Sequence, residues 1–202
     1  MRGSLAVVAL LAQAGADGSC SFSSGCSWDK LPFKCTNPAL SVDYTNVATY
    51  SGVVSCGNLF LEADIGGGIN IAPLVIWPAA KADAYYTIMM IDPDADVDGS
   101  FPNIHAAGSH APVRHWIQGN VPGSALAQGS IAGSDVVSPF HGPSPPAGSH
   151  RYGQFIFEQA GQQKFVAFNA TASIAQFDYA AWLVQNGLKD AVASNWHITK
   201  HS

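Results

Sequence analysis

Asp92-Pro93-Asp94-Ala95 ends an apolar run from Tyr85 to Ile91 and is the most informative stretch of this sequence. Further along the chain come His115-Trp116 and the run Pro145-Pro146-Ala147-Gly148-Ser149-His150-Arg151-Tyr152. Proline restricts the backbone, which lowers the entropy cost of holding polar groups ready for a ligand. Two carboxylates and two histidines in such segments predict a small polar pocket for a phosphate-like group, although Asp-Pro-Asp is also an ordinary turn sequence.

The composition fits one globular domain. The chain has 202 residues, of which 48% are hydrophobic and only 11% are charged. This length allows a substantial buried core. The formal net charge is −5 and the sequence has no Lys/Arg cluster. Nucleic acid is therefore not expected as a partner, because nothing would neutralise its phosphates.

Most of the chain before Tyr152 has the pattern of β-strands. Apolar or alternating runs, separated by Gly and Pro, predict an antiparallel β fold with long loops. The expected strands are Ser41–Tyr44, Asn58–Ala63, Ile69–Trp77, Tyr85–Ile91, His115–Gln118, Gln154–Glu158 and a final one within Ala191–Ile198, and Lys164–Phe168 alternates in the same way. The Gly/Pro/Ser-rich segment 130–149 is too long for a hairpin turn and is expected to be a loop.

One good helix is predicted near the C-terminus. Its apolar residues at helical spacing are Phe177, Ala180, Ala181, Val184 and Leu188, and Gly187 follows as a stop signal. No repeat, heptad pattern or linker divides the chain. The prediction is therefore a single β-rich domain with one main helix.

The N-terminal residues 1–16 have the pattern of a signal peptide. Arg2 precedes an apolar run from Leu5 to Ala12, and the small residues Ala14 and Ala16 follow. A buried N-terminal strand or helix is the alternative. No later stretch is long and apolar enough to cross a membrane. We therefore expect a secreted protein with a Cys/Ser/Gly-rich segment at 17–38 and the domain at 39–202.

The cysteines agree with export. All four lie in the first third of the chain: Cys20, Cys26, Cys35 and Cys56. An even number in an oxidising compartment predicts two disulfides with three possible pairings, and free buried thiols are the alternative. Asn169-Ala170-Thr171 is a glycosylation sequon that export would make usable.

Metal and hydrolase sites are poorly supported. His105, His110 and His115 are spaced five apart, so no single helix or strand brings them together. The cysteine gaps do not match zinc spacing, and no G-x-S-x-G elbow or phosphate-cradling glycine loop occurs. No cofactor and no metal are expected. General acid–base hydrolysis by the acid and histidine cluster is a third possibility, but no nucleophile is marked.

Together, and in this order, these segments resemble the phosphatidylethanolamine-binding protein family. The likeness extends from about Leu40 to Trp196. Its parts are Ala72–Trp77, Tyr86-Thr87, Asp92–Ala95, His115–Ile117, Asn120–Gly123 and Gly142–Tyr152 with Phe155, Phe157 and Gln159. The sequence departs from the usual family pattern at Asp96, Val113 and Phe140, which puts headgroup selectivity in doubt more than the existence of the pocket.

The resemblance implies a fold and a ligand. The fold would be mainly β, with a large antiparallel sheet packed on a smaller sheet and few helices. The residues that would bind the ligand are Asp92, Asp94, His115, Pro145, Pro146, His150 and Tyr152. The protein would be a secreted, non-enzymatic binder of phospholipid headgroups or similar phosphate-bearing anions. The alternative is an extracellular protein-interaction module, such as a protease inhibitor, with segment 17–38 as its contact surface.

Arg151 directly follows His150, and neighbouring side chains on a strand face opposite ways. Arg151 is therefore expected to bond structural carboxylates rather than ligand.

Overall fold

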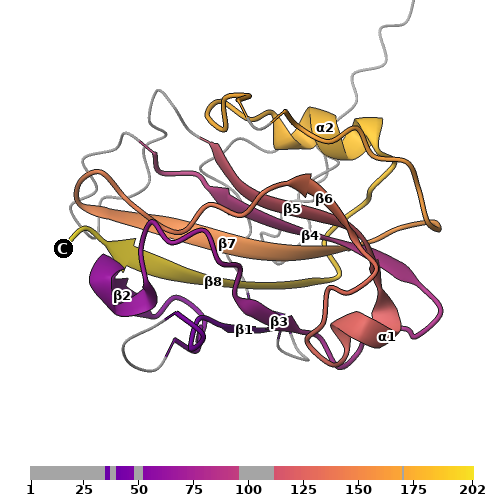
Figure 1. Ribbon diagram of the computed structural model, residues 1–202, viewed down its shortest axis with the longest axis horizontal. Coiled ribbons are helices and arrows are strands. Elements are labelled where there is room, and N and C mark those ends of the chain that lie inside the picture. Colours follow the sequence, from indigo (N-terminus) through magenta and orange to yellow (C-terminus); the bar gives the residue numbers. More distant parts are fainter. Residues whose placement is uncertain (1–34, 37–39, 48–51, 96–111, 170) are drawn as a thin grey trace, which may run out of the picture.

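A computed structural model describes residues 35–36, 40–47, 52–95, 112–169 and 171–202 (Figure 1). The expected signal peptide, Cys20, Cys26 and most of segment 17–38 lie outside these residues. Two sheets form the described part, and their strands are β1 (Ser41–Asp43), β2 (Leu59–Leu61), β3 (Leu74–Ile76), β4 (Tyr85–Asp92), β5 (Val113–Pro122), β6 (Asp135–Ser138), β7 (Ser149–Glu158) and β8 (Ala193–Lys200). None of the described helices has the length and apolar character needed to cross a membrane.

The large sheet has six strands in the order β2-β8-β7-β4-β5-β6, and β1 pairs with β3 in a small second sheet. All neighbours are antiparallel except β2 and β8, which run parallel with Leu59 opposite Ile198. The small sheet lies on one side of the large sheet and helix α2 (Tyr179–Gln185) lies on the other (Figure 1). The mainly β, two-sheet fold predicted from the sequence is therefore confirmed.

Strand β4 shows why the core has two halves. Successive side chains of a strand point to opposite faces, and here Ile88 and Met90 pack into the cluster beneath the small sheet. Met89 and Ile91 pack into the cluster beneath α2. Because β4 is covered on both faces, its sequence is a continuous apolar run rather than an alternating one.

Helix α2 forms where the sequence predicts it. The Asp178 side chain accepts a hydrogen bond from the Ala181 backbone N–H at 2.9 Å and so caps the first turn. Gly187 follows the helix with a φ of 64°, a conformation that glycine adopts without steric cost. Trp182 and Leu183 are buried against the large sheet. Two short helices, η3 (Glu62–Ile65) and α1 (Gly123–Leu126), were not predicted.

Four local predictions need correction. Of the strand expected over 69–77, only Leu74–Ile76 is a strand. The strand expected over 58–63 ends at Leu61, where η3 begins. Segment 164–168 is not a strand. Its backbone bond to β6 is the one that the Phe168 N–H donates to the Val137 carbonyl at 2.8 Å. The Phe165 ring packs on Gly119 of β5. Alternation there arises from packing on the sheet rather than from pairing within it. The expected loop over 130–149 contains the edge strand β6.

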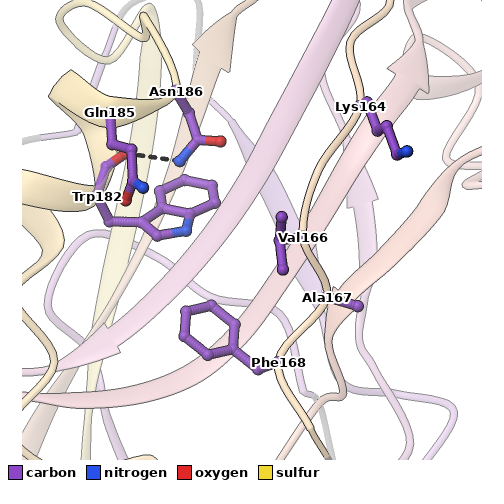
Figure 2. A pocket seen from close by; sticks show the side chains of 7 residues that line it. All are labelled: Lys164, Val166, Ala167, Phe168, Trp182, Gln185 and Asn186. Carbon is purple, nitrogen blue, oxygen red and sulfur yellow. Dashed lines mark hydrogen bonds between the residues drawn. The ribbon is translucent and has the colours of Figure 1, made fainter.

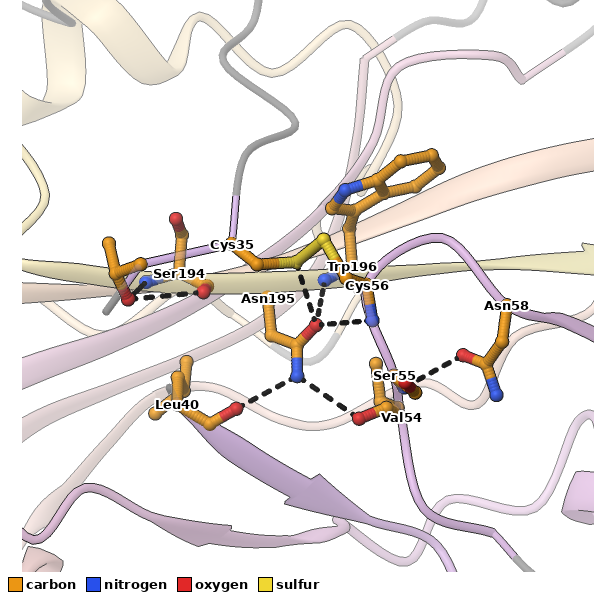
Figure 3. Close-up of a disulfide and its surroundings, with 10 residues drawn as sticks. Cys35, Leu40, Val54, Ser55, Cys56, Asn58, Ser194, Asn195 and Trp196 are labelled. Carbon is orange, nitrogen blue, oxygen red and sulfur yellow. Dashed lines mark hydrogen bonds between the residues drawn. A yellow bond between two sulfur atoms is a disulfide. The ribbon is translucent and has the colours of Figure 1, made fainter. Parts of the chain in front are cut away.

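A disulfide joins Cys35 to Cys56, with their Cα atoms 5.7 Å apart (Figure 3). Beside it, the buried Asn195 side chain of β8 donates to the carbonyls of Leu40 at 2.8 Å and Val54 at 3.2 Å. The disulfide and this amide together hold the start of the domain against β8. One of the two expected disulfides is thus confirmed; a second bridge would have to join Cys20 to Cys26, which stays a prediction.

Candidate functional site

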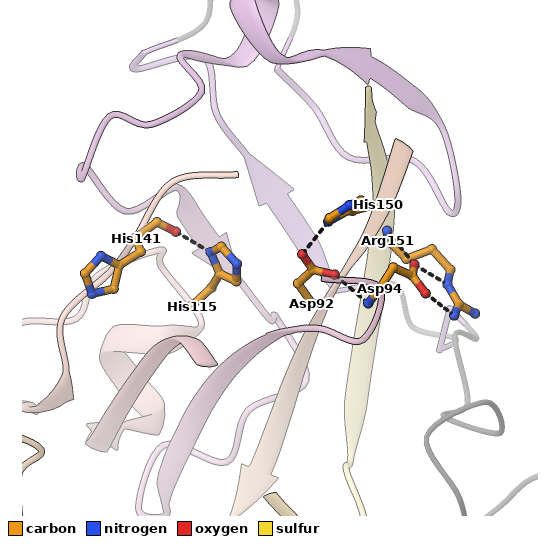
Figure 4. A network of polar contacts seen from close by, with 6 residues as sticks. All are labelled: Asp92, Asp94, His115, His141, His150 and Arg151. Atoms are coloured by element: carbon orange, nitrogen blue, oxygen red, sulfur yellow. Dashed lines mark hydrogen bonds and ion pairs between the residues drawn. The ribbon is translucent and has the colours of Figure 1, made fainter. Parts of the chain in front are cut away.

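The turn after β4 separates the two carboxylates of Asp92-Pro93-Asp94. The Asp94 N–H donates to Asp92 Oδ1 at 2.7 Å, and this bond closes the turn. The other oxygen, Asp92 Oδ2, lies 2.8 Å from His150 Nδ1 on β7 (Figure 4). Both side chains of this pair are almost fully buried. The pair therefore joins the turn after β4 to β7.

Asp94 turns the other way and pairs with Arg151. The guanidinium donates to the two Asp94 oxygens at 2.7 and 2.6 Å, and the Arg151 backbone N–H adds a third bond at 2.9 Å (Figure 4). Asp94 is 0% exposed. The prediction that Arg151 bonds a structural carboxylate is confirmed. Asp94 is used in this clamp, which holds the turn to β7.

His115 projects from β5 and donates from Nδ1 to the His141 carbonyl at 2.8 Å. A carbonyl oxygen can only accept, so Nδ1 carries the proton and Nε2 is the ring atom left for other partners. Burial lowers the pKa of His115 below its ordinary value, while the Asp92 charge and the His141 carbonyl act in the opposite direction. His115 is therefore neutral at pH 7 and accepts rather than donates through Nε2.

Tyr152 packs against these histidines. Its ring meets the His115 ring edge to face, with the centroids 5.1 Å apart, and stacks on His197 at 5.4 Å. His150 stacks more loosely, at 6.5 Å. Burial raises the pKa of the Tyr152 phenol well above its usual value. The ring thus stays neutral and fixes the imidazoles by packing.

A cavity of about 340 Å³ is lined in part by Asp92, His115 and His150. It is lined by Gly68, Asn70, Asp92, Ala95, Val113, His115, His141, Gly142, Ser144, Pro146, His150 and Ile174. Of the seven residues predicted to bind ligand, Asp92, His115, Pro146 and His150 line it. Asp94, Pro145 and Tyr152 do not, and their direct contact with ligand stays a prediction.

Sequence reasoning missed three polar residues of the lining, namely Asn70, His141 and Ser144. All three lie in loops of the structure, although Asn70 was placed within the strand expected over 69–77. Ser144 lies inside the matched segment 142–152 and His141 directly before it, so their position in the chain was the available signal. Among the described residues, no three His, Cys, Asp or Glu side chains gather closely enough to hold a metal ion; His105 and His110 lie outside these residues.

The lining combines one carboxylate with imidazoles of different character. His150 is held by Asp92, whereas His115 is held by a neutral carbonyl. Such a pocket matches a small polar molecule better than an apolar one, because the buried polar atoms need partners. An ammonium group would match Asp92, and an anionic oxygen would match the imidazoles once they are protonated.

Comparison with known proteins points to one family. A sequence model of the phosphatidylethanolamine-binding protein family matches residues 43–197. Phomoidride biosynthesis cluster protein N of Talaromyces stipitatus is 30% identical over 128 residues, which cover 58% of this chain and 60% of that protein. CEN-like protein 1 of Nicotiana tabacum is 33% identical over 109 residues, covering 54% of this chain and 55% of that protein. The chain thus matches little more than half the length of these two relatives.

Solved structures with the same fold are more distant in sequence. A carboxypeptidase Y inhibitor, determined in complex with its cognate proteinase, has a TM-score of 0.58 at 19% identity and covers 81% of this chain and 83% of its own. A phosphatidylethanolamine-binding protein from Plasmodium vivax also has a TM-score of 0.58, at 17% identity, and covers 81% and 85%. At these identities the likeness supports the fold.

Proposed function

Because the chain belongs to the phosphatidylethanolamine-binding protein family, we propose that it is a secreted, non-enzymatic binder of phosphate-bearing small molecules such as phospholipid headgroups. The observation that carries this proposal is the cavity that His115, His150 and Asp92 line together. A lipid headgroup and a free phosphate compound share the phosphate chemistry that these side chains recognise.

The protonation states give the binding a direction in pH. Neutral His115 offers a lone pair at Nε2, which repels an anion; after protonation the same atom donates a charge-assisted hydrogen bond. Because burial lowers the pKa of free His115, binding an anion must be accompanied by proton uptake near neutral pH. Affinity for phosphoethanolamine should therefore rise as the pH falls from 8 toward 5.

Titration with phosphoethanolamine, followed by histidine NMR shifts at several pH values, tests this function. The signals of His115 and His150 should move, and inorganic phosphate and ethanolamine should show which end of the ligand is held. His150→Gln should lower the affinity by about tenfold or more, because a hydrogen bond to a charged group contributes about 1.5–3 kcal/mol.

His201→Gln is the matched control. That side chain is 50% exposed and paired with Glu62, so its loss should leave the affinity unchanged. If neither His115 nor His150 responds at millimolar ligand, the pocket does not bind phosphate compounds. Turnover of a phosphoester that disappears in His150→Gln would instead make the protein an enzyme.

Secretion has its own test. Mass spectrometry of the native protein should find an N-terminus near Gly15 or Asp17. All four cysteines should resist alkylation without reductant. An intact Met1 with reactive thiols would mean that the protein is not exported, and would leave the pocket proposal untouched.

The second candidate is an extracellular protease inhibitor. It is supported by the shared fold of the carboxypeptidase Y inhibitor and by the disulfide that joins Cys35 to Cys56, whose backbone N–H donates to Asn195 of β8 at 3.2 Å. Deleting residues 17–34, which retains the disulfide, should abolish inhibition and spare anion binding. A panel of serine carboxypeptidases and endoproteases that are all uninhibited by the intact protein would remove this candidate.

A further inference from the structure

A second hollow lies on the face of the large sheet that α2 covers, and it shares no lining residue with the cavity of His115 and His150. It has a volume of about 440 Å³ and is bounded by segment 164–168 and by the C-terminal end of α2 (Figure 2). We call it the α2 groove. Its lining consists of Lys164, Val166, Ala167, Phe168, Trp182, Gln185 and Asn186.

The aromatic wall of the α2 groove is rigid. Trp182 stacks on Phe165 with the ring centroids 5.9 Å apart and the planes 11° from parallel. Phe168 is fixed from behind by the Arg114 guanidinium, which lies 3.5 Å from the ring centroid. A ligand that packs on these rings would meet a surface already in place, which lowers the entropy cost of binding.

Polar groups surround that wall. The side chains of Lys164 and Gln185 are exposed, and Asn186 donates to the Trp182 carbonyl at 2.7 Å, which leaves its Oδ1 free to accept (Figure 2). The groove therefore combines aromatic faces with donors and acceptors at its rim.

The apolar exposure at this place is also unusual. Among the described residues, the two most exposed large hydrophobic side chains are Val166, at 85%, and Val184, at 66%. Val166 lines the groove, and Val184 is on the helix that forms its other wall. Val184 is not part of the lining, so Val166 is the strongly exposed apolar side chain of the groove itself. Exposed apolar surface in a groove marks a place that another group can cover.

A residue that can carry a covalently attached group directly follows the groove residue Phe168 in the sequence. Asn169, directly after Phe168, is exposed and begins the sequon Asn169-Ala170-Thr171. Its Oδ1 accepts hydrogen bonds from the Thr171 N–H at 3.1 Å and from the Thr171 hydroxyl at 3.2 Å. The asparagine and threonine of the acceptor triplet are thus already held together on the surface.

We infer that Asn169 carries an N-linked glycan whose first sugars lie in the α2 groove. The inference rests on the export that is part of the proposed function. The amide Nδ2 of Asn169 displaces a lipid-linked diphosphate from the sugar C1 of a secretory-pathway oligosaccharide donor. The N–C1 bond forms, the C1–O bond breaks, the lipid diphosphate leaves, and an amide proton passes to base.

A glycan fits both properties of the groove. A pyranose ring has a face of C–H groups, which packs on Trp182 and Phe168, and a rim of hydroxyls, which bonds amide and ammonium groups such as those of Gln185 and Lys164. Because the glycan is attached at the adjacent residue, its local concentration is high and weak contacts suffice. The bound sugars would cover Val166.

The test uses residues 17–202 secreted from eukaryotic cells behind a heterologous signal peptide, so that it does not depend on whether residues 1–16 direct export. Intact mass measures the occupancy of Asn169. Hydrogen–deuterium exchange of amides 164–168 and 182–186 is then compared with that of Thr171→Ala, which lacks the glycan but keeps Asn169, and with that of the wild type after enzymatic deglycosylation.

The matched control places a similar glycan elsewhere. In the Thr171→Ala background, Gln128→Asn completes an acceptor triplet with Gly129 and Ser130 on an exposed turn. Exchange in both groove segments should slow several-fold with the Asn169 glycan and not with the relocated one. An unoccupied Asn169, or an occupied one with unchanged exchange, overturns the inference. Phosphoethanolamine affinity of the same proteins, expected to be equal, reports separately on the proposed function.

Discussion

Acid should destabilise this protein through one buried histidine. His197 on β8 is 0% exposed and lies among aromatic rings, stacked on Tyr152 and edge-on to Tyr44 and Phe60. Burial lowers its pKa from 6.5 to about 3, and the nearby His115 acts in the same direction. Folding therefore holds this ring neutral at pH values where the unfolded chain binds a proton.

The size of the effect follows from the two pKa values. A group whose pKa is depressed by folding contributes stability above its unfolded pKa, and this stability is lost as the pH falls toward the folded pKa. Between pH 7 and pH 4 the unfolded chain takes up the proton while folded His197 stays neutral. At about 1.4 kcal/mol for each pH unit below 6.5, the loss is about 3 kcal/mol.

Guanidinium unfolding at pH 7 and pH 4, without reductant, measures this loss. His197→Phe is the comparison, because phenylalanine keeps an aromatic ring in the stack and does not titrate. Other ionisable groups contribute to both proteins, so the wild type should lose about 3 kcal/mol more than the variant. If the two proteins lose the same stability, burial does not hold His197 neutral in the folded protein.

Three further predictions concern the supports of the fold. Asp94→Ala removes the carboxylate that pairs with the buried Arg151 guanidinium, so unfolding in guanidinium chloride should show a loss of about 3–5 kcal/mol. Replacing both cysteines of the described disulfide, whose sequence separation is 21, with serine should cost about 3 kcal/mol, visible as a lower Tm. Gly123→Ala would push a Cβ into the Lys81 carbonyl and should cost about 1–3 kcal/mol. Gly161→Ala, which has nothing within 4 Å, should leave Tm unchanged.

The sequence predicted those parts of the molecule that depend on periodicity. Strand β4 and helix α2 were found because a continuous apolar run and a 3.6-residue spacing are both local properties of the chain. The sequence could not assign the roles of Asp92 and Asp94. They are only two residues apart, and the backbone of one turn decides which of them reaches His150 and which reaches Arg151.

Residues from loops were beyond prediction for a different reason. The His141 carbonyl orients His115, and Asn70 closes one side of the cavity, yet both depend on loop paths across the surface. Segment 164–168 shows the converse error. Its pattern suggested a paired strand, but Phe165 and Phe168, three residues apart, are the partly buried side chains that pack against the cluster beneath α2.

The candidate site is held in place by the protein itself, through two adjacent residues of β7. His150 and Arg151 point to opposite faces of their strand, and each holds one carboxylate of the same turn. The turn is thus fixed from both faces, and Asp92 cannot swing toward solvent without breaking its bond to the Asp94 N–H. A ligand entering this cavity needs to order little of the protein, so its affinity should be set mainly by protonation of the imidazoles rather than by closure of a loop.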